Sequence, residues 1–263
     1  MHKPSDEHSN VARVPVREVP VSHAFRWLAL GWKDLIRAPA TSLMHGVIVT
    51  IGGWFILAIT LHYWYLVSGA FSGFLLVGPI LATGLYELSR RLAQGEQPGI
   101  REVIAAWRRG TRPLVWLGLM LVIAGTGWVL VSAVLFALFV QAPITSLESF
   151  LRYVVISEGS FLFPVWITLG GFGAAIVFAA TVVSAPMLLD RDVDMVTALA
   201  TSIRAVGENP FTMVVWASII MVATGIAALT LMLGFVLMIP VIGHATWHAY
   251  RDLVDASGLP PRD

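Results

Sequence analysis

The sequence predicts an all-α fold, a polytopic membrane bundle of six transmembrane helices, and its composition gives the first reasons. Hydrophobic residues make up 57% of the 263 residues and charged residues only 13%, with a mean hydropathy of +0.79. A soluble domain carries about 25% charged residues, so this chain has too few to cover a surface that faces water. Most of its exterior must face lipid, which excludes soluble enzymes and disordered proteins. The net charge of +1, without a long basic tract, excludes nucleic acid as a partner.

Six stretches are long and apolar enough to cross a bilayer, which takes about 20 helical residues. Each must be a helix, because lipid offers no partners to unpaired backbone groups. The last two stretches are separated only by a turn predicted at Leu231–Gly234. We keep this break because roughly 40 unbroken residues would form a helix of about 60 Å, twice the core thickness. The predicted spans are Ser42–Val67, Phe71–Leu88, Leu114–Val140, Phe161–Leu189, Phe211–Leu231 and Leu233–Tyr250.

The basic residues predict the orientation of these spans in the membrane. Of the 17 Lys and Arg residues, only Arg152 falls on the side opposite to the others. The positive-inside rule therefore places both termini in the cytoplasm. Residues 1–20 lack the apolar core of a cleaved signal peptide and are expected to form a disordered cytoplasmic arm. Residues 21–255 then form a single six-helix transmembrane domain, and residues 256–263 a short cytoplasmic tail.

A unit of similar elements recurs three times, which makes a three-fold internal repeat a further hypothesis. Each unit starts with a stretch whose apolar residues follow the helical period, which is typical of a short amphipathic helix at the membrane interface. The alternative is that these three helices pack under the bundle as a cytoplasmic cap. A proline, which suits a first helical turn, opens the following span. The stretches are Phe25–Leu35, Ile100–Trp107 and Val196–Ile203, the opening prolines are Pro39, Pro113 and Pro210, and the prolines inside the second spans are Pro79, Pro186 and Pro240.

Polar side chains follow each inner proline at fixed distances and form the candidate site. Positions four residues apart share one helix face, so three repeated units around one axis would bring these side chains together near the cytoplasmic end. They are Thr83, Asp190 and His244 four residues after the prolines, and Glu87, Asp194 and His248 eight residues after them. The spacing of His244 and His248 suits one metal ion, with Glu87, Asp190 and also His45 as further candidate ligands. The alternative is that these residues only anchor helix ends among the headgroups.

Motifs of established chemistry are missing from the sequence. There is no phosphate-binding loop, dinucleotide fingerprint, nucleophile elbow or zinc-protease motif, and no cysteine. We therefore predict no catalytic residue and no cofactor. The glycines suit the close approach of two helices better than the unwinding of a helix around a substrate. They are Gly52, Gly53, Gly125, Gly127, Gly170, Gly171 and Gly173.

Two stretches resemble a known family. GPILATGLYELSRRLAQGEQP (Gly78–Pro98) and PVIGHATWHAYRDLV (Pro240–Val254) are similar to an uncharacterised proteobacterial family of predicted integral membrane proteins, which carry a domain of unknown function. The resemblance extends over roughly Val19–Val254. It implies a bacterial inner membrane and about six helices. It implies no activity and no role for His244 or Glu87.

These observations predict a non-enzymatic, multi-pass protein of the bacterial cytoplasmic (inner) membrane. We expect an accessory or assembly subunit whose partners are the lipid bilayer and other membrane subunits. One alternative is a transporter or channel for small molecules or ions, with three repeats around a path. A second alternative is a metal- or haem-binding membrane protein that uses His244 and His248.

Overall fold

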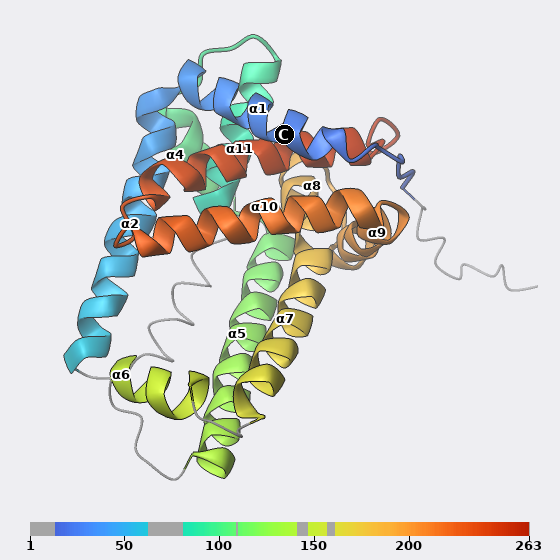
Figure 1. The fold of residues 1–263 in the computed structure, drawn as a ribbon. Helices are drawn as coiled ribbons and strands as arrows, with labels where there is room; N and C mark the ends of the chain where they lie inside the picture. Colours follow the sequence, from blue (N-terminus) through green and yellow to red (C-terminus); the bar gives the residue numbers. More distant parts are fainter. Residues whose placement is uncertain (1–13, 63–80, 109, 141–146, 157–160, 263) are drawn as a thin grey trace, which may run out of the picture.

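The computed structural model describes residues 14–62, 81–108, 110–140, 147–156 and 161–262, and over these ranges the fold is all-α (Figure 1). Residues 81–93 are helical and lie between α2 and α4 in the chain. The labelled helices are α1 (Ser22–Arg37), α2 (Pro39–His62), α4 (Ile100–Arg108), α5 (Arg112–Phe139), α6 (Leu147–Phe150) with a π-helical turn (Leu151–Val155), α7 (Leu162–Thr181), α8 (Ser184–Asp190), α9 (Met195–Glu208), α10 (Pro210–Leu229) and α11 (Phe235–Leu253).

Four helical stretches of the described residues are long and apolar enough to cross a membrane. They are Pro39–Ala58, Arg112–Phe139, Leu162–Asp190 and Pro210–Leu229. These four lie within or overlap four of the six predicted spans. Most of the predicted span Phe71–Leu88 lies outside the described residues, and Leu233–Tyr250 is helical in α11 but is not among the four.

The short helices and the prolines after them form as the sequence predicts. α1, α4 and α9 occupy the three amphipathic stretches, α2 begins at Pro39, and α10 begins at Pro210. The residue before a proline is disfavoured in the helical conformation, which separates α1 from α2 and α9 from α10. Ala38 and Asn209, at two of these junctions, have nearly the same backbone angles, with φ −131° and ψ 57° in one and φ −128° and ψ 49° in the other.

A break divides the fourth predicted span into α7 and α8. Pro186 has no N–H for the carbonyl of Val182, four residues earlier, and the helix is interrupted at that residue and the next. The break also leaves the N–H of Val183 and the carbonyl of Ala179 without helical partners, and Ser202 of α9 bonds to both. Its hydroxyl accepts a hydrogen bond from the N–H of Val183 (3.1 Å) and donates one to the carbonyl of Ala179 (2.7 Å).

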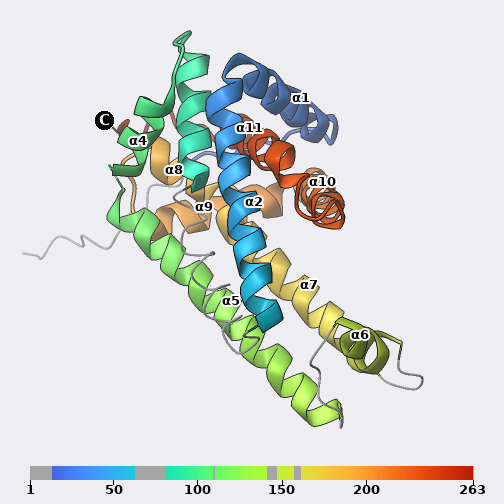
Figure 2. The same cartoon turned by 90° about the vertical axis from the view of Figure 1, so that its left-hand side faces the viewer.

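α11 lies at the centre of the folded body, and its contacts with α1 and α2 are the most extensive among the labelled helices. The backbones of α1 and α11 are so close at Gly31 that a Cβ there would lie 2.5 Å from the carbonyl oxygen of Val241. In both views α10 and α11 run across the direction of α2 (Figures 1 and 2). α10 is the first span of the third predicted unit, so the described helices do not show three units around one axis.

The apolar stripe of α1 divides between two environments. Leu35 is buried, whereas Phe25 and Trp32 are exposed. The buried face of the helix instead contains Trp27 and Gly31, together with Ala24 and Asp34. α1 therefore packs on the body, as in the cap alternative, and keeps an apolar outer face as an interfacial helix would.

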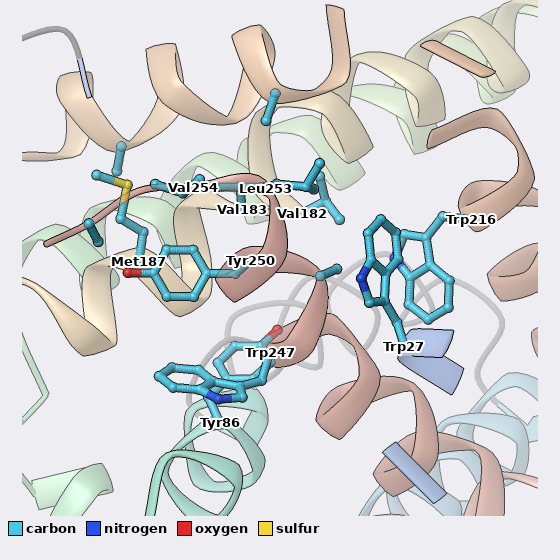
Figure 3. Packing of buried hydrophobic residues seen from close by; sticks show 14 of the residues in the cluster. Trp27, Tyr86, Val182, Val183, Met187, Trp216, Trp247, Tyr250, Leu253 and Val254 are labelled. Atoms are coloured by element: carbon cyan, nitrogen blue, oxygen red, sulfur yellow. The ribbon is translucent and has the colours of Figure 1, made fainter. Parts of the chain in front are cut away.

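Aromatic residues fill the core of this body (Figure 3). Trp27 of α1 and Trp216 of α10 meet edge to face, with ring centroids 5.7 Å apart and an interplanar angle of 87°. Trp247 and Tyr250 of α11 are buried as well, and the Tyr250 ring lies beside Met187 of α8 in Figure 3. The core thus joins the first, middle and last parts of the chain.

Residues 14–20, which the sequence predicts to belong to a disordered arm, are ordered in the structure. Val14 is buried, the N–H of Arg17 donates to the carbonyl of Leu253 (2.8 Å), and the N–H of Val19 donates to the side chain of Asn209 (2.8 Å). The predicted tail is also packed, because the N–H of Arg262 donates to the carbonyl of Asp190 (3.0 Å). Residues 1–13 lie outside the described part.

Candidate functional site

A chain of five polar side chains crosses the interior of the body, and we call it the buried polar network. Ser42 of α2 contacts His244 Nε2 (2.9 Å), Ser89 contacts His244 Nδ1 (2.7 Å) and Asp34 of α1 (2.8 Å), and His248 Nε2 contacts Asp34 (2.8 Å). Four helical segments therefore meet through side chains that are far apart in the sequence.

The donor count fixes the proton positions along the network. The Asp34 carboxylate can only accept, so Ser89 and His248 Nε2 both donate to it. With its one proton directed at Asp34, the Ser89 hydroxyl accepts from His244 Nδ1–H. His244 Nε2 is then an acceptor for the hydroxyl of Ser42 when the ring is neutral. Each hydrogen bond thus has one donor and one acceptor.

The network is closed to solvent at one end and reaches the surface at the other. Ser42, Ser89 and His244 are fully buried, Asp34 is 4% exposed, and the His248 side chain is 19% exposed. Burial opposes the charge on Asp34, but the hydrogen bonds from His248 and Ser89 outweigh it and hold the pKa of Asp34 below its ordinary value of 3.8. Asp34 is thus a buried carboxylate whose charge is compensated by specific partners.

His45 of α2 makes a second contact in the interior, with the ring of Trp107 in α4. Its Nδ1 is bonded to the carbonyl of Thr41 (2.8 Å), and its ring meets the Trp107 ring with centroids 5.5 Å apart. His45 Nε2 and Trp107 Nε1 both face the space above Gly84, and among the described residues neither has a hydrogen-bond partner. His45 Nε2 is an acceptor when Nδ1 donates to Thr41, and Trp107 Nε1–H is a donor. Gly84 is required here, because a Cβ would overlap His45 Nε2.

The four predicted metal ligands have separate partners. Glu87 accepts from Arg90 Nε (2.8 Å) and Arg91 Nε (2.7 Å) on its own helix, while its neighbour Ser89 is the residue that contacts His244. Asp190 accepts from the hydroxyl of Tyr250 (2.8 Å) and from Arg191 Nε (3.0 Å). Asp190 thus meets α11 through Tyr250 and Arg251 rather than through His244 or His248.

The other predicted polar positions have structural roles. Thr83 is buried, and Asp194 is the N-cap of α9, where it accepts from the N–H of Thr197 (2.9 Å) and from its hydroxyl (2.6 Å). These bonds lower the pKa of Asp194 from its ordinary value. Among the described residues no group of three or more His, Asp and Glu side chains is placed to hold a metal ion. The metal site at His244 and His248 stays a prediction that the described contacts do not favour.

Asp34, Ser42 and Ser89 are the members of the network that the sequence analysis missed. A signal for Asp34 was present, because it lies seven residues after Trp27 and three after Gly31, so the three share one face of α1. An acidic side chain on the same helix face as a tryptophan and a glycine is expected to be buried and therefore to have a partner. Neither serine has a comparable signal, because its partner depends on how the helices pack.

The all-helical fold and its four long apolar stretches define a helical integral membrane protein. Residues 66–190 match the model of a family described as "Predicted integral membrane protein (DUF2189)". The predicted resemblance to a membrane-protein family of unknown function is therefore confirmed, over a segment that contains Gly78–Pro98 but not Pro240–Val254. No curated protein and no solved structure matches the chain.

Proposed function

We propose that the protein is a non-enzymatic accessory or assembly subunit of a membrane complex in the bacterial inner membrane. The observation that carries this proposal is the surface of the hairpin formed by α5 and α7. In α5 only Leu117 and Gly118 are buried, both near its first turns, and in α7 only Leu162 is buried. The hairpin extends away from the body in Figures 1 and 2. Its apolar surface therefore needs lipid or another protein to cover it.

The hairpin itself is held together by tryptophans. Trp166 of α7 donates a hydrogen bond to the hydroxyl of Ser132 in α5 (2.9 Å), and Trp128 lies 5.7 Å from Trp166 between ring centroids. A Cβ at Gly170 would lie 2.8 Å from the Trp128 ring, so this glycine admits the indole. These contacts fix the two helices at a defined separation.

An apolar groove of about 440 Å³ runs between these helices, and small residues line much of it. Gly173 lies in the groove, and a Cβ added there would meet no atom within 4 Å. In lipid, small residues let a second helix approach closely, which favours association through packing. We infer that one transmembrane helix of a partner subunit occupies the groove. Its lining residues are Leu121, Ala124, Gly125 and Trp128 of α5 and Gly170, Gly173, Ala174, Ile176 and Val177 of α7.

Two glycines offer a matched test of this role. Gly173 lines the groove and Gly127 does not, and both lie in apolar helices where an added Cβ meets no atom within 4 Å. Replacing either with leucine changes the helix equally, but only Gly173→Leu fills the groove. Native mass spectrometry of the tagged protein, isolated gently from its own membrane, should show a co-purifying subunit with the wild type and Gly127→Leu, but not with Gly173→Leu. A monomer in all three samples would contradict the proposal.

The proposed topology has six spans, adding Phe71–Leu88 and α11 to the four candidate stretches, with both termini in the cytoplasm. The order of stripe, proline and proline supports three repeated units, as does the shared backbone conformation of Ala38 and Asn209. Because the chain has no cysteine, single cysteines can report each side. An impermeant thiol reagent added to intact spheroplasts should label Glu148→Cys and Leu231→Cys, but not Ser257→Cys. The reverse pattern, or an unlabelled Leu231→Cys, would overturn this topology.

A second candidate function, proton transport, is favoured by the buried polar network. Every member of the network can pass a proton to the next by rotating or by changing tautomer, and ionisable residues within membrane proteins often form such relays. Protein reconstituted into vesicles with a potassium diffusion potential should then acidify or alkalise the lumen. Loss of this flux in Asp34→Asn would support transport, whereas wild-type vesicles without flux would exclude it.

A further inference from the structure

A pocket of about 400 Å³ lies where the end of the helical segment 81–93, the end of α8 and α11 meet the C-terminal residues. It shares His248 with the buried polar network, and Trp247, a residue type that favours the membrane interface, also contributes to its wall. We call it the arginine pocket. Its lining residues are Arg90, Ala93, Gln94, Asp190, Arg191, Trp247, His248, Arg251 and Pro261.

Positive charge dominates this pocket. Arg90, Arg191 and Arg251 contribute three guanidinium groups, and Asp190 is the single carboxylate among the lining residues. That carboxylate already accepts from the hydroxyl of Tyr250 and from Arg191 Nε, and lies 3.5 Å from Arg251 Nη1. Asp190 therefore orients Arg191 and Arg251, while Arg90 is held by Glu87, which lies outside the lining and is shared with Arg91.

Each guanidinium keeps donors for a further ligand. A guanidinium carries five N–H donors. Among the described residues, Arg90 uses Nε and Nη2 on Glu87, and Arg191 uses Nε on Asp190 and Nη1 on the carbonyl of Leu259. The Arg251 side chain is 51% exposed and lies in a long contact of 3.5 Å with Asp190. The bonds that Arg90 and Arg191 do make hold them in place, which reduces the entropy lost when an anion binds.

We propose that the arginine pocket binds a phosphate group. Guanidinium groups match phosphate oxygens with paired, charge-assisted hydrogen bonds, and several arginines around one pocket suit an anion with several oxygens. The proposed cytoplasmic side of the membrane provides two sources, the headgroup of an anionic lipid and free phosphate. The volume suits a headgroup, since ligand pockets begin at about 300 Å³.

The test compares two exposed arginines with similar surroundings. Arg251 lines the pocket, is 51% exposed and lies 3.5 Å from Asp190, whereas Arg26 of α1 lies outside the pocket, is 57% exposed and lies 3.7 Å from Asp252. Replacing either with glutamine removes one charge and one long ion pair. The full chain is purified in a neutral detergent and depleted of lipid. Native mass spectrometry then follows the binding of phosphatidylglycerol, and equilibrium dialysis follows inorganic phosphate.

The wild type should bind one molecule of either phosphatidylglycerol or phosphate. Arg26→Gln should bind the same ligand with the same affinity as the wild type. Arg251→Gln should bind that ligand roughly tenfold more weakly, the effect of losing one charged hydrogen bond. Arg251→Glu should abolish binding, and Arg251→Lys should restore part of it. A headgroup site retains the lipid when inorganic phosphate is added in excess, whereas a site for free phosphate releases it. Binding of neither ligand, or equal weakening by Arg26→Gln and Arg251→Gln, would overturn the proposal.

Discussion

α11 and α5 are both long helices of this protein, yet they bury opposite kinds of surface. α11 contains two histidines and an internal proline, and about half of its residues are buried against α1, α2, α8 and α10. α5 has no charged residue between Leu114 and Phe139, and only Leu117 and Gly118 are buried. The comparison shows that the rest of the protein covers the more polar helix, α11. The apolar helix α5 is left to be covered by lipid or by a partner.

This contrast has a simple physical cause. In water an apolar helix is driven into the interior, but in lipid the tails are as apolar as leucine and provide no such drive. Polar side chains gain more from leaving lipid, because an unpaired polar group there costs several kcal/mol. Asp34, Ser89 and His244 therefore determine which helices pack together, and the hairpin of α5 and α7 remains at the periphery.

The largest expected effect is the loss of the Asp34 carboxylate. Asp34→Ala leaves Ser89 and His248 without their buried acceptor, and at about 2 kcal/mol for each unpaired donor the loss is about 4 kcal/mol. Thermal unfolding in detergent, followed by tryptophan fluorescence, should show a large fall in the midpoint. Asp255→Ala, at the exposed partner of Arg17, should leave the midpoint nearly unchanged. Equal midpoints for the two variants would remove the network from the account of stability.

A pair of leucine truncations compares the two regions directly. Leu253 of α11 is fully buried, whereas the side chain of Leu138 in α5 is 72% exposed. Leu253→Ala should destabilise the protein by about 3 kcal/mol through the cavity that it leaves. Leu138→Ala should change the stability by about 0.5 kcal/mol or less. The same unfolding measurement checks both, and a larger loss at Leu138 would reverse the comparison.

A smaller effect is expected where α9 supports the break between α7 and α8. Ser202→Ala leaves the N–H of Val183 and the carbonyl of Ala179 without their shared partner, at a cost of about 2 kcal/mol. Ser218→Ala is the control, because the hydroxyl of Ser218 only returns a hydrogen bond to Val214 in its own helix. Hydrogen exchange should become faster around residues 179–187 in Ser202→Ala alone. Unchanged exchange there would mean that the break needs no support.

The smallest effect is confined to acidic solution. Because the folded-state pKa of Asp34 lies below its ordinary 3.8, the carboxylate stabilises the folded state fully above that value, and this contribution is lost as the pH falls through the lower pKa. The unfolding midpoint of the wild type should therefore fall toward that of Asp34→Asn as the pH decreases below about 4. Parallel curves for the two proteins across this range would show that Asp34 is not charged in the folded state.

The local structure followed from the sequence more readily than the site did. Pro39, Pro113 and Pro210 marked helix starts because proline restricts its own backbone and that of the residue before it, and these are local effects. The turn after α10 was also predictable, since residues 230–234 form it and the expected segment was Leu231–Gly234. Such features depend on neighbours in the chain.

The buried polar network depends on neighbours in space. Asp34 and His248 are 214 residues apart, and nothing in either segment alone specifies the other. Glu87 was assigned to His244 on the assumption of a common axis, although its spacing to Arg90 and Arg91 already indicated local ion pairs. Local pairs of that kind deserve priority over contacts inferred from a repeat.

The central claim is that a partner helix occupies the groove of α5 and α7, and crosslinking in the native membrane tests it most directly. A photo-reactive amino acid is placed at Ala174, which lines the groove, or at Phe172, which is 68% exposed on the same helix and does not line it. Irradiation should join Ala174 to one discrete protein and leave Phe172 with lipid adducts alone. Lipid adducts alone at both positions, or the same protein captured at both, would contradict the claim.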